Sequence, residues 1–319
     1  MKRVLAAFIS VLLVLSVCAC GGQITENKNK IRVVTTIFPI YDWVRNVAIG
    51  VDEVEISLLM DSGVDLHSFQ PTVEDIVKIS NCDIFVYVGG ESDKWVDDAL
   101  KEGTNKEMIT INLFDVLGDG KCEEELKEGM QGEDEEDKEE VEYDEHIWLS
   151  LKNAKVLCGT ICDGLCRADS KNSKAYKLNK DVYIDKLDAL DKEYEQAVVQ
   201  SSKNTLVFGD RFPFRYMTED YNIDYYAAFI GCSAESEASF KTIIFLANKV
   251  DELELNSIIK IESSDGLLAK TIKDNTATKD AQILTLDSMQ SVTAKDMSGG
   301  VTYINICKEN LEVLREALK

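Results

Sequence analysis

The feature that most constrains the fold is an alternation of short apolar runs with helical patterns, interrupted once by a much longer helical stretch. In residues 83–88 (DIFVYV), every side chain after Asp83 is apolar, as expected for a strand covered on both faces. Strands that alternate with helices indicate a parallel sheet, because each connecting helix returns the chain to the same edge. The sequence therefore predicts an α/β protein.

The expected strands form two groups on either side of the long helix. They cover residues 32–36, 54–60, 83–88, 108–113, 205–208, 224–229, 257–261 and 281–286. Residues 171–201 repeat apolar side chains at helical spacing with charges between them, and such a helix is on the order of 45 Å long. We expect two lobes, each a roughly four-stranded parallel sheet flanked by helices, joined by one long rigid backbone helix.

The N-terminus has the pattern of a processing signal. Lys2 and Arg3 precede a short apolar run, and Val17-Cys18-Ala19-Cys20 reads as a lipobox with Cys20 at the lipid-accepting position. The run is too short for an ordinary transmembrane helix. A plain secretory signal is the alternative, and Cys18 is a competing lipid acceptor. We expect a mature protein anchored outside the cytoplasmic membrane through Cys20.

These patterns predict the following division of the chain. A lipoprotein signal peptide covers residues 1–20 and a tether 21–30. The N-terminal lobe covers 31–169 and includes an acidic loop at 122–145. The linker helix covers 170–202 and the C-terminal lobe 203–319.

The charge of the chain excludes one class of partner. A formal net charge of -23 argues against binding nucleic acid, whose phosphates require a basic face. The acidic runs at 123–125 and 133–137 repel themselves, so residues 122–142 are expected to be a disordered surface loop. The loop is either a solvated insertion without a role or a weak collector of cations.

Seven cysteines follow Cys20, and an odd number without paired spacing is not a disulfide framework. Cys158, Cys162 and Cys166 recur every four residues and would share one face of a helix. As thiolates they would bind a soft metal. Their interpretation as small apolar residues in a buried stripe is preferred.

The two histidines of the chain both stand in short polar segments. His67 lies in Asp65-Leu66-His67-Ser68-Phe69-Gln70-Pro71, and His146 in Asp144-Glu145-His146-Ile147-Trp148. Neutral imidazole is the commonest protein ligand for transition metals. In the second half, Glu262 and Asp287 follow predicted strand ends, where ligands of α/β sheets bind.

Several segments together resemble the metal-specific (cluster A-I) solute-binding proteins of zinc and manganese ABC transporters, over nearly all of the mature chain. The segments are 33–42 (VVTTIFPIYD), 63–72 (GVDLHSFQPT), Gly90-Glu91 with Trp95, 144–149 (DEHIWL), the long helix, 233–235 (SAE) and 286–288 (LDS). The order of these segments along the chain matches that of the family.

The resemblance implies a metal site between the lobes. His67 and His146 would be ligands from the N-terminal lobe, and Asp287 a carboxylate ligand from the C-terminal lobe. A third ligand, histidine or glutamate, should precede an aromatic-rich helix start. A gapless match places Arg211 there, which cannot coordinate a metal, so the neighbouring Asp210 is the expected substitute. Glu262 is a second candidate.

Two imidazoles with one or two carboxylates suit zinc, whereas carboxylate-rich sets shift the preference toward manganese. The acidic insertion favours Zn²⁺ as the cargo, with Mn²⁺ as the alternative. The resemblance implies a monomer that delivers zinc to an ABC permease at the membrane, with small lobe movement because a stiff helix joins the lobes. The other hypotheses are a metal-dependent extracellular hydrolase, for which no helical H-E-x-x-H pair exists, and an adhesin or sensor lipoprotein.

Overall fold

The computed structural model describes residues 30–132, 142–233 and 237–319. The proposed signal peptide and Cys20 lie outside these ranges. Ile31–Lys319 forms one compact unit. Within the described ranges, none of the helices has both the length and the apolar character that a membrane span requires.

The N-terminal lobe is built on a parallel sheet with strand order β2-β1-β3-β4. Its strands are β1 (Ile31–Thr35), β2 (Val54–Leu58), β3 (Ile84–Tyr87) and β4 (Ile109–Asn112). All four residues of β3 are buried, which agrees with a strand covered on both faces. The helices of this lobe are α2 (Phe38–Val47), α3 (Val73–Asn81), α4 (Trp95–Lys101), α5 (Leu113–Val116) and α6 (Leu151–Ala168).

The C-terminal lobe repeats this topology with strand order β6-β5-β7-β8, again parallel. Its strands are β5 (Thr205–Phe212), β6 (Asp224–Ile230), β7 (Ser257–Ile261) and β8 (Gln282–Leu286). Its helices are α8 (Arg215–Tyr221), α9 (Phe240–Glu252), α10 (Leu267–Asp274), α11 (Ala294–Ser298) and α12 (Tyr303–Ala317). The predicted fold class, two four-stranded parallel sheets flanked by helices, is confirmed.

The end of β5 differs from the prediction in a way that affects the site. We expected the strand to stop at residue 208 and Arg211 to begin the turn into a helix. Instead, a register shift between Phe208 and Arg211 lets β5 continue to Phe212. Arg211 is therefore a strand residue at the carboxyl edge of the sheet.

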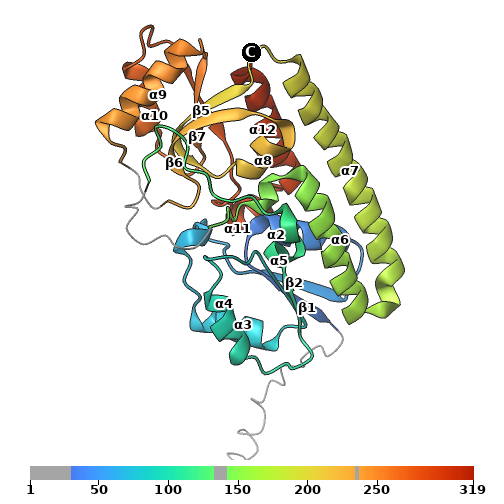
Figure 1. Ribbon diagram of the computed structural model, residues 1–319. Helices are drawn as coiled ribbons and strands as arrows, with labels where there is room; N and C mark the ends of the chain where they lie inside the picture. The colour runs from blue at the N-terminus through green and yellow to red at the C-terminus, as the bar shows by residue number, and fades with distance from the viewer. Residues whose placement is uncertain (1–29, 133–141, 234–236) are drawn as a thin grey trace, which may run out of the picture. The chain divides into compact units, whose positions relative to one another are not determined.

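The long helix is α7 (Ser173–Gln200), of 28 residues, and it packs against α6, α2 and α12 (Figure 1). Asn179 Nδ2 donates to the carbonyl oxygens of Val47 and Ile49, at 3.0 and 2.8 Å. Near the other end, Tyr194 Oη donates to the carbonyl oxygen of Cys307, at 2.5 Å. The helix is thus hydrogen-bonded to α2 of one lobe and to α12, which follows the other.

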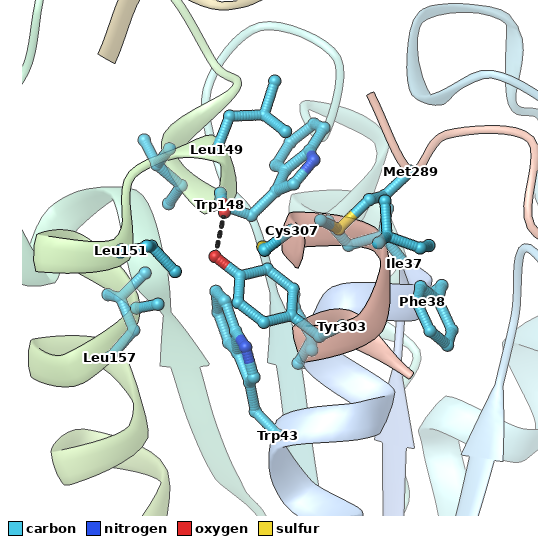
Figure 2. Close-up of a cluster of buried hydrophobic side chains, with 14 of the residues drawn as sticks. Ile37, Phe38, Trp43, Trp148, Leu149, Leu151, Leu157, Met289, Tyr303 and Cys307 are labelled. Carbon is cyan, nitrogen blue, oxygen red and sulfur yellow. Dashed lines mark hydrogen bonds between the residues drawn. The ribbon is translucent and has the colours of Figure 1, made fainter. Parts of the chain in front are cut away.

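One apolar core contains residues of both lobes. Trp43 of α2 packs edge-to-face on Tyr303 of α12, with ring centroids 5.3 Å apart (Figure 2). Tyr303 Oη donates to the carbonyl oxygen of Trp148 at 2.6 Å, and Trp148 Nε1 donates to that of Ser288 at 2.9 Å. All of these side chains are buried, so the lobes share a dry apolar interface.

The interpretation of residues 122–142 as a disordered loop is wrong for the part that the structure describes. Residues 122–132 cross from the N-terminal lobe to the C-terminal sheet, where Gln131 N donates to the carbonyl oxygen of Ala228 at 2.9 Å. Gln131 forms an isolated bridge with Phe229, and Tyr225 Oη donates to the Glu125 carboxylate at 3.2 Å. The charge pattern of the sequence did not predict these contacts with the C-terminal sheet. Residues 133–141 lie outside the described residues.

The cysteine stripe lies on α6. Cys158 and Cys162 are buried in the core and Cys166 is partly buried, and all three are free thiols. They take part in no group of side chains suited to a metal among the residues described. The structure agrees with their interpretation as apolar residues of a buried helical face.

Candidate metal centre

His67 lies in a short 3-10 helix, η2 (Leu66–Ser68), shortly after β2. Asp65 caps this turn, since its Oδ1 accepts a hydrogen bond from His67 N at 3.0 Å. The His67 ring is fixed through Nδ1, which lies 2.8 Å from Ser92 Oγ. Ser92 Oγ in turn donates to Glu145, so Ser92 has only a lone pair left for the ring. His67 Nδ1 therefore carries the hydrogen.

His146 immediately precedes the 3-10 helix η5 (Ile147–Leu149) and is fully buried. Asp144 holds it twice, because Oδ1 accepts from His146 N at 2.8 Å and from Nδ1 at 3.1 Å. A carboxylate that accepts from the remote ring nitrogen fixes the tautomer and the direction of a metal-binding histidine. His146 has this arrangement.

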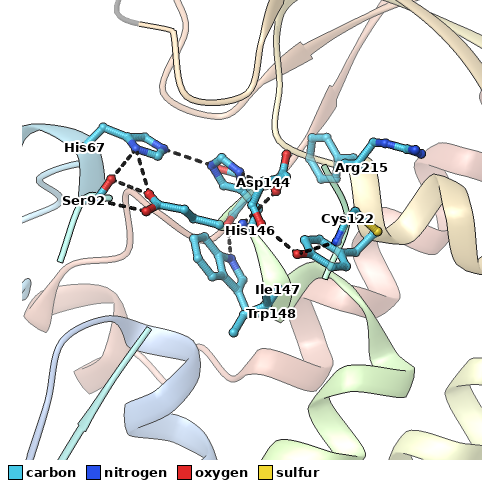
Figure 3. A network of polar contacts seen from close by, with 12 residues as sticks. His67, Ser92, Cys122, Asp144, His146, Ile147, Trp148 and Arg215 are labelled. Atoms are coloured by element: carbon cyan, nitrogen blue, oxygen red, sulfur yellow. Dashed lines mark hydrogen bonds and ion pairs between the residues drawn. The ribbon is translucent and has the colours of Figure 1, made fainter. Parts of the chain in front are cut away.

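The two rings therefore present their free nitrogens to each other. His67 Nε2 and His146 Nε2 are 3.2 Å apart (Figure 3). With both Nδ1 atoms protonated, two lone pairs meet at this point, and an unfavourable contact of this kind needs a cation between the atoms. A proton on either ring would relieve this contact, and a metal ion held by both nitrogens would do so at nearly the same spacing, since two nitrogens of one tetrahedral zinc ion lie about 3.3 Å apart.

The pKa values of the two rings differ in direction. Burial, followed by the neighbouring His146, lowers the pKa of His67 to about 4. Burial alone would also lower the pKa of His146, but the Asp144 carboxylate outweighs it and raises that pKa. Protonation of the pair is therefore more favourable on His146 than on His67.

A residue that the sequence did not single out lies beside the two rings. Among the described residues, the ligand atoms of His67, His146 and Cys232 form the group that could share an ion, all within 4.8 Å of one another. Cys232 follows β6, at the carboxyl edge of the C-terminal sheet. The rule that ligands bind at this edge applies to every strand, and applied to β6 it would have pointed to Cys232.

The backbone beside Cys232 lies close to the ring of His146. A Cβ placed on Gly231 would lie 3.1 Å from His146 Cε1 and 2.8 Å from the carbonyl oxygen of Phe212. Only glycine allows this approach without displacement of a neighbour. The backbone of the C-terminal lobe therefore leaves no room for a side chain between Gly231 and the His146 ring.

The structure does not bring Asp210 or Asp287 into this group. Asp210 Oδ1 accepts from Arg211 N at 2.9 Å, and its Oδ2 accepts from Ile261 N at 3.2 Å, so it joins β5 to β7 across the bulge. Asp287 Oδ1 accepts from Met289 N at 2.7 Å. Burial and then the Glu262 carboxylate raise the pKa of Asp287 to about 7.

Glu262, the second candidate, is occupied by hydroxyl and amide donors. It accepts from Ser288 N at 2.8 Å, from Ser288 Oγ at 3.0 Å and from Ser291 Oγ at 3.2 Å. These bonds organise the loop after β8. Glu262 therefore supports the loop that carries Asp287.

Arg211 connects the lobes at the edge of the site. Its Nη2 donates to Asp65 Oδ2 at 3.0 Å, and its Nη1 donates to the carbonyl oxygen of Ser233 at 3.3 Å. Asp65 holds the His67 turn and Ser233 follows Cys232. One guanidinium group therefore joins the segment of a histidine to the segment of the cysteine.

Two glycines and a buried carboxyl group shape the loop that supports His67. Gly89 and Gly90 have φ of +92° and +85°, which favours glycine, and a Cβ on Gly90 would lie 2.3 Å from Glu145 Oε1. Asp93 Oδ2 accepts from Gly89 N at 2.9 Å. Burial raises the pKa of Asp93 to about 7.

The variant Asp93→Asn is expected to gain stability relative to the wild type as the pH rises. The folded protein keeps a proton on Asp93 that the unfolded chain releases near pH 4. The free energy of unfolding of the wild type therefore falls as the pH rises from about 4 to the folded pKa near 7. The difference should grow by about 2 kcal/mol between pH 5 and pH 7 and then level off. Urea unfolding at intervals of one pH unit measures it, with the exposed Asp97→Asn as the matched variant. A constant difference across this range would contradict the assignment.

A family model described as "Zinc-uptake complex component A periplasmic" matches residues 33–317. The chain belongs to this family. The match covers both lobes and includes His67, His146 and Cys232. It agrees with the resemblance to solute-binding proteins of metal transporters.

Similar proteins support the family membership. The chain is 30% identical over 305 residues to the zinc-binding protein AdcA of Streptococcus pyogenes, covering 92% of this chain and 58% of that protein. It thus spans little more than half of that relative. It is 27% identical to the high-affinity zinc uptake system protein ZnuA of Bacillus subtilis, covering 99% of this chain and 98% of that protein.

A solved structure gives the same fold. The Zn(II)-bound ZnuA-like domain of AdcA from Streptococcus pneumoniae superposes with a TM-score of 0.71 at 27% identity. The match covers 91% of this chain and 99% of that domain. The two-lobed architecture therefore occurs in a structure with bound zinc.

Proposed function

We propose that this chain is an extracytoplasmic solute-binding protein that captures zinc between its two lobes and delivers it to an ABC permease. It acts as a lipoprotein anchored through Cys20 and performs no catalysis. The observation that carries the proposal is the facing pair of ring nitrogens, His67 Nε2 and His146 Nε2, each fixed through its Nδ1. The zinc named in the descriptions of the relatives supports the same cargo.

The donor chemistry favours zinc over manganese. Two neutral imidazoles backed by carboxylates suit a four-coordinate zinc ion, at about 2.0–2.1 Å from each nitrogen. Asp287 and Asp210 remain the proposed carboxylate ligands, with Glu262 as the alternative to Asp210, since zinc entry between the lobes would change their distances to the rings. Ligands from both lobes would make binding stabilise the closed form that a permease recognises.

Metal binding to the mature protein tests the proposal. Competition with a chromophoric chelator should show one zinc per chain, bound much more tightly than manganese. The variant His67→Ala/His146→Ala should lose at least about 1000-fold in zinc affinity, because it removes both imidazoles. A folding control is the circular dichroism of the variant. Unchanged affinity in this variant, or absence of zinc binding by the wild type, would overturn the proposal.

A further inference from the structure

The histidine pair leaves a zinc ion with too few ligands. Both imidazoles come from the N-terminal lobe, and zinc in proteins is almost always four-coordinate. A ligand from the C-terminal lobe is also needed if zinc is to hold the lobes together. Arginine occupies the position where the family resemblance places a third ligand, and its guanidinium group cannot coordinate a metal.

Cys232 Sγ is the C-terminal lobe atom that meets this requirement among the described residues. It lies within 4.8 Å of both ring nitrogens, and an approach of about 1 Å would bring it to the roughly 3.5 Å that separates sulfur and nitrogen ligands of one tetrahedral zinc ion. Asp210 and Asp287, by contrast, use their carboxylates for backbone donors of their own lobe. The close approach of Gly231 to His146 keeps the Cys232 segment against the pair.

Arg211 gives an independent reason for the position of Cys232. Its two terminal nitrogens donate to Ser233 O, next to the cysteine, and to Asp65, next to the His67 turn. The Arg211 side chain is only 20% exposed and that of Asp65 21%, so this pairing is largely shielded from solvent. Arg211, which stands at the expected ligand position, therefore fixes the segment that carries Cys232.

We propose that Cys232 binds zinc as a thiolate and is the third ligand of the centre, which completes an imidazole–imidazole–thiolate set. This inference rests on the proposed function. When the ion enters, the S–H bond breaks, the zinc–sulfur bond forms, and the proton leaves to solvent. No oxidation or reduction takes place. Before the ion arrives the thiol is neutral, because burial and then the Asp144 and Glu124 carboxylates raise the pKa of Cys232.

A thiolate ligand determines which metal the site prefers. Soft sulfur favours zinc and cobalt over manganese, whose preferred ligands are carboxylates and water. It also supplies a negative charge that two neutral imidazoles lack. The set is therefore more selective against manganese than the set of two imidazoles and one or two carboxylates considered from the sequence.

Cobalt(II) titration of the mature, reduced protein tests the role of the sulfur. A thiolate–cobalt bond gives a near-ultraviolet charge-transfer band, which nitrogen and oxygen ligands do not give. The wild type should show this band with one equivalent of cobalt. Cys232→Ser should lack it, still bind cobalt, and bind zinc at least about tenfold more weakly. Cys166→Ser, a partly buried cysteine of α6, is the matched control and should behave as the wild type.

The outcomes separate the two proposals. Cobalt and zinc binding without the charge-transfer band, or a band that persists in Cys232→Ser, would overturn the cysteine ligand and leave the zinc-binding function standing. Absence of binding of either metal to the wild type would overturn both. The thermal unfolding of metal-free Cys232→Ser shows whether the variant is folded.

Discussion

Replacement of Asp144 with alanine is expected to lower zinc affinity by about 10-fold to 100-fold, although Asp144 is not a member of the ligand group. Its Oδ1 accepts from both Nδ1 and the backbone nitrogen of His146, so it fixes the direction and the tautomer of the ring. Without it, the hydrogen can move to Nε2, the atom that must bind the ion. Chelator competition with zinc on the purified variant measures the loss.

The variant Asp191→Ala provides the matched control. Asp191 is also a buried carboxylate, but it lies on α7 and accepts from Tyr221 Oη at 2.8 Å and from Lys155 Nζ at 3.0 Å. Its removal should lower stability and leave zinc affinity unchanged. If both variants weakened zinc binding equally, a general loss of structure would explain the effect, and the orienting role of Asp144 would be wrong.

The second large effect is expected for Trp148→Ala, which should lower the free energy of unfolding of the metal-free protein by about 3–5 kcal/mol. The indole is almost fully buried at the interface of the lobes (Figure 2), and its Nε1 donates to the carbonyl oxygen of Ser288. Its loss leaves a cavity and an unpaired carbonyl group. Chemical denaturation in the presence of a chelator measures the change.

Trp148→Phe separates the two contributions. It keeps most of the apolar ring and removes the hydrogen bond to Ser288, so it should cost only about 1–3 kcal/mol. An alanine variant no less stable than the phenylalanine variant would contradict a packed interface at this position. Both variants leave His67, His146 and Cys232 unchanged.

The architecture could be predicted from the sequence because each strand and helix carries a local signal. The apolar run that became β3 and the helical spacing that became α7 depend only on neighbouring residues. Thr72 is a typical N-cap residue before α3, and the structure shows its capping box with Asp75. The end of β5 was misplaced because a bulge leaves no trace in the apolar pattern.

The site could be predicted only in part. His67 and His146 stand out because the chain has no other histidine, and the structure brings their Nε2 atoms together. Cys232 does not stand out among nine cysteines, since its role depends on which strand edge faces the pair. The same limit applies to Arg211, whose partners Asp65 and Ser233 are 146 and 22 residues away.

The buried position of Tyr303 has a consequence for how the chain acquires its structure. Its backbone nitrogen donates to Asp42 Oδ2, at 3.2 Å and across 261 residues, and its ring fills the core beside Trp43. The N-terminal lobe is therefore incomplete until the last helix has been synthesised. Contacts of such long range slow folding, because a large loop must close before they form. The last helix therefore decides when the packing of the N-terminal lobe is complete.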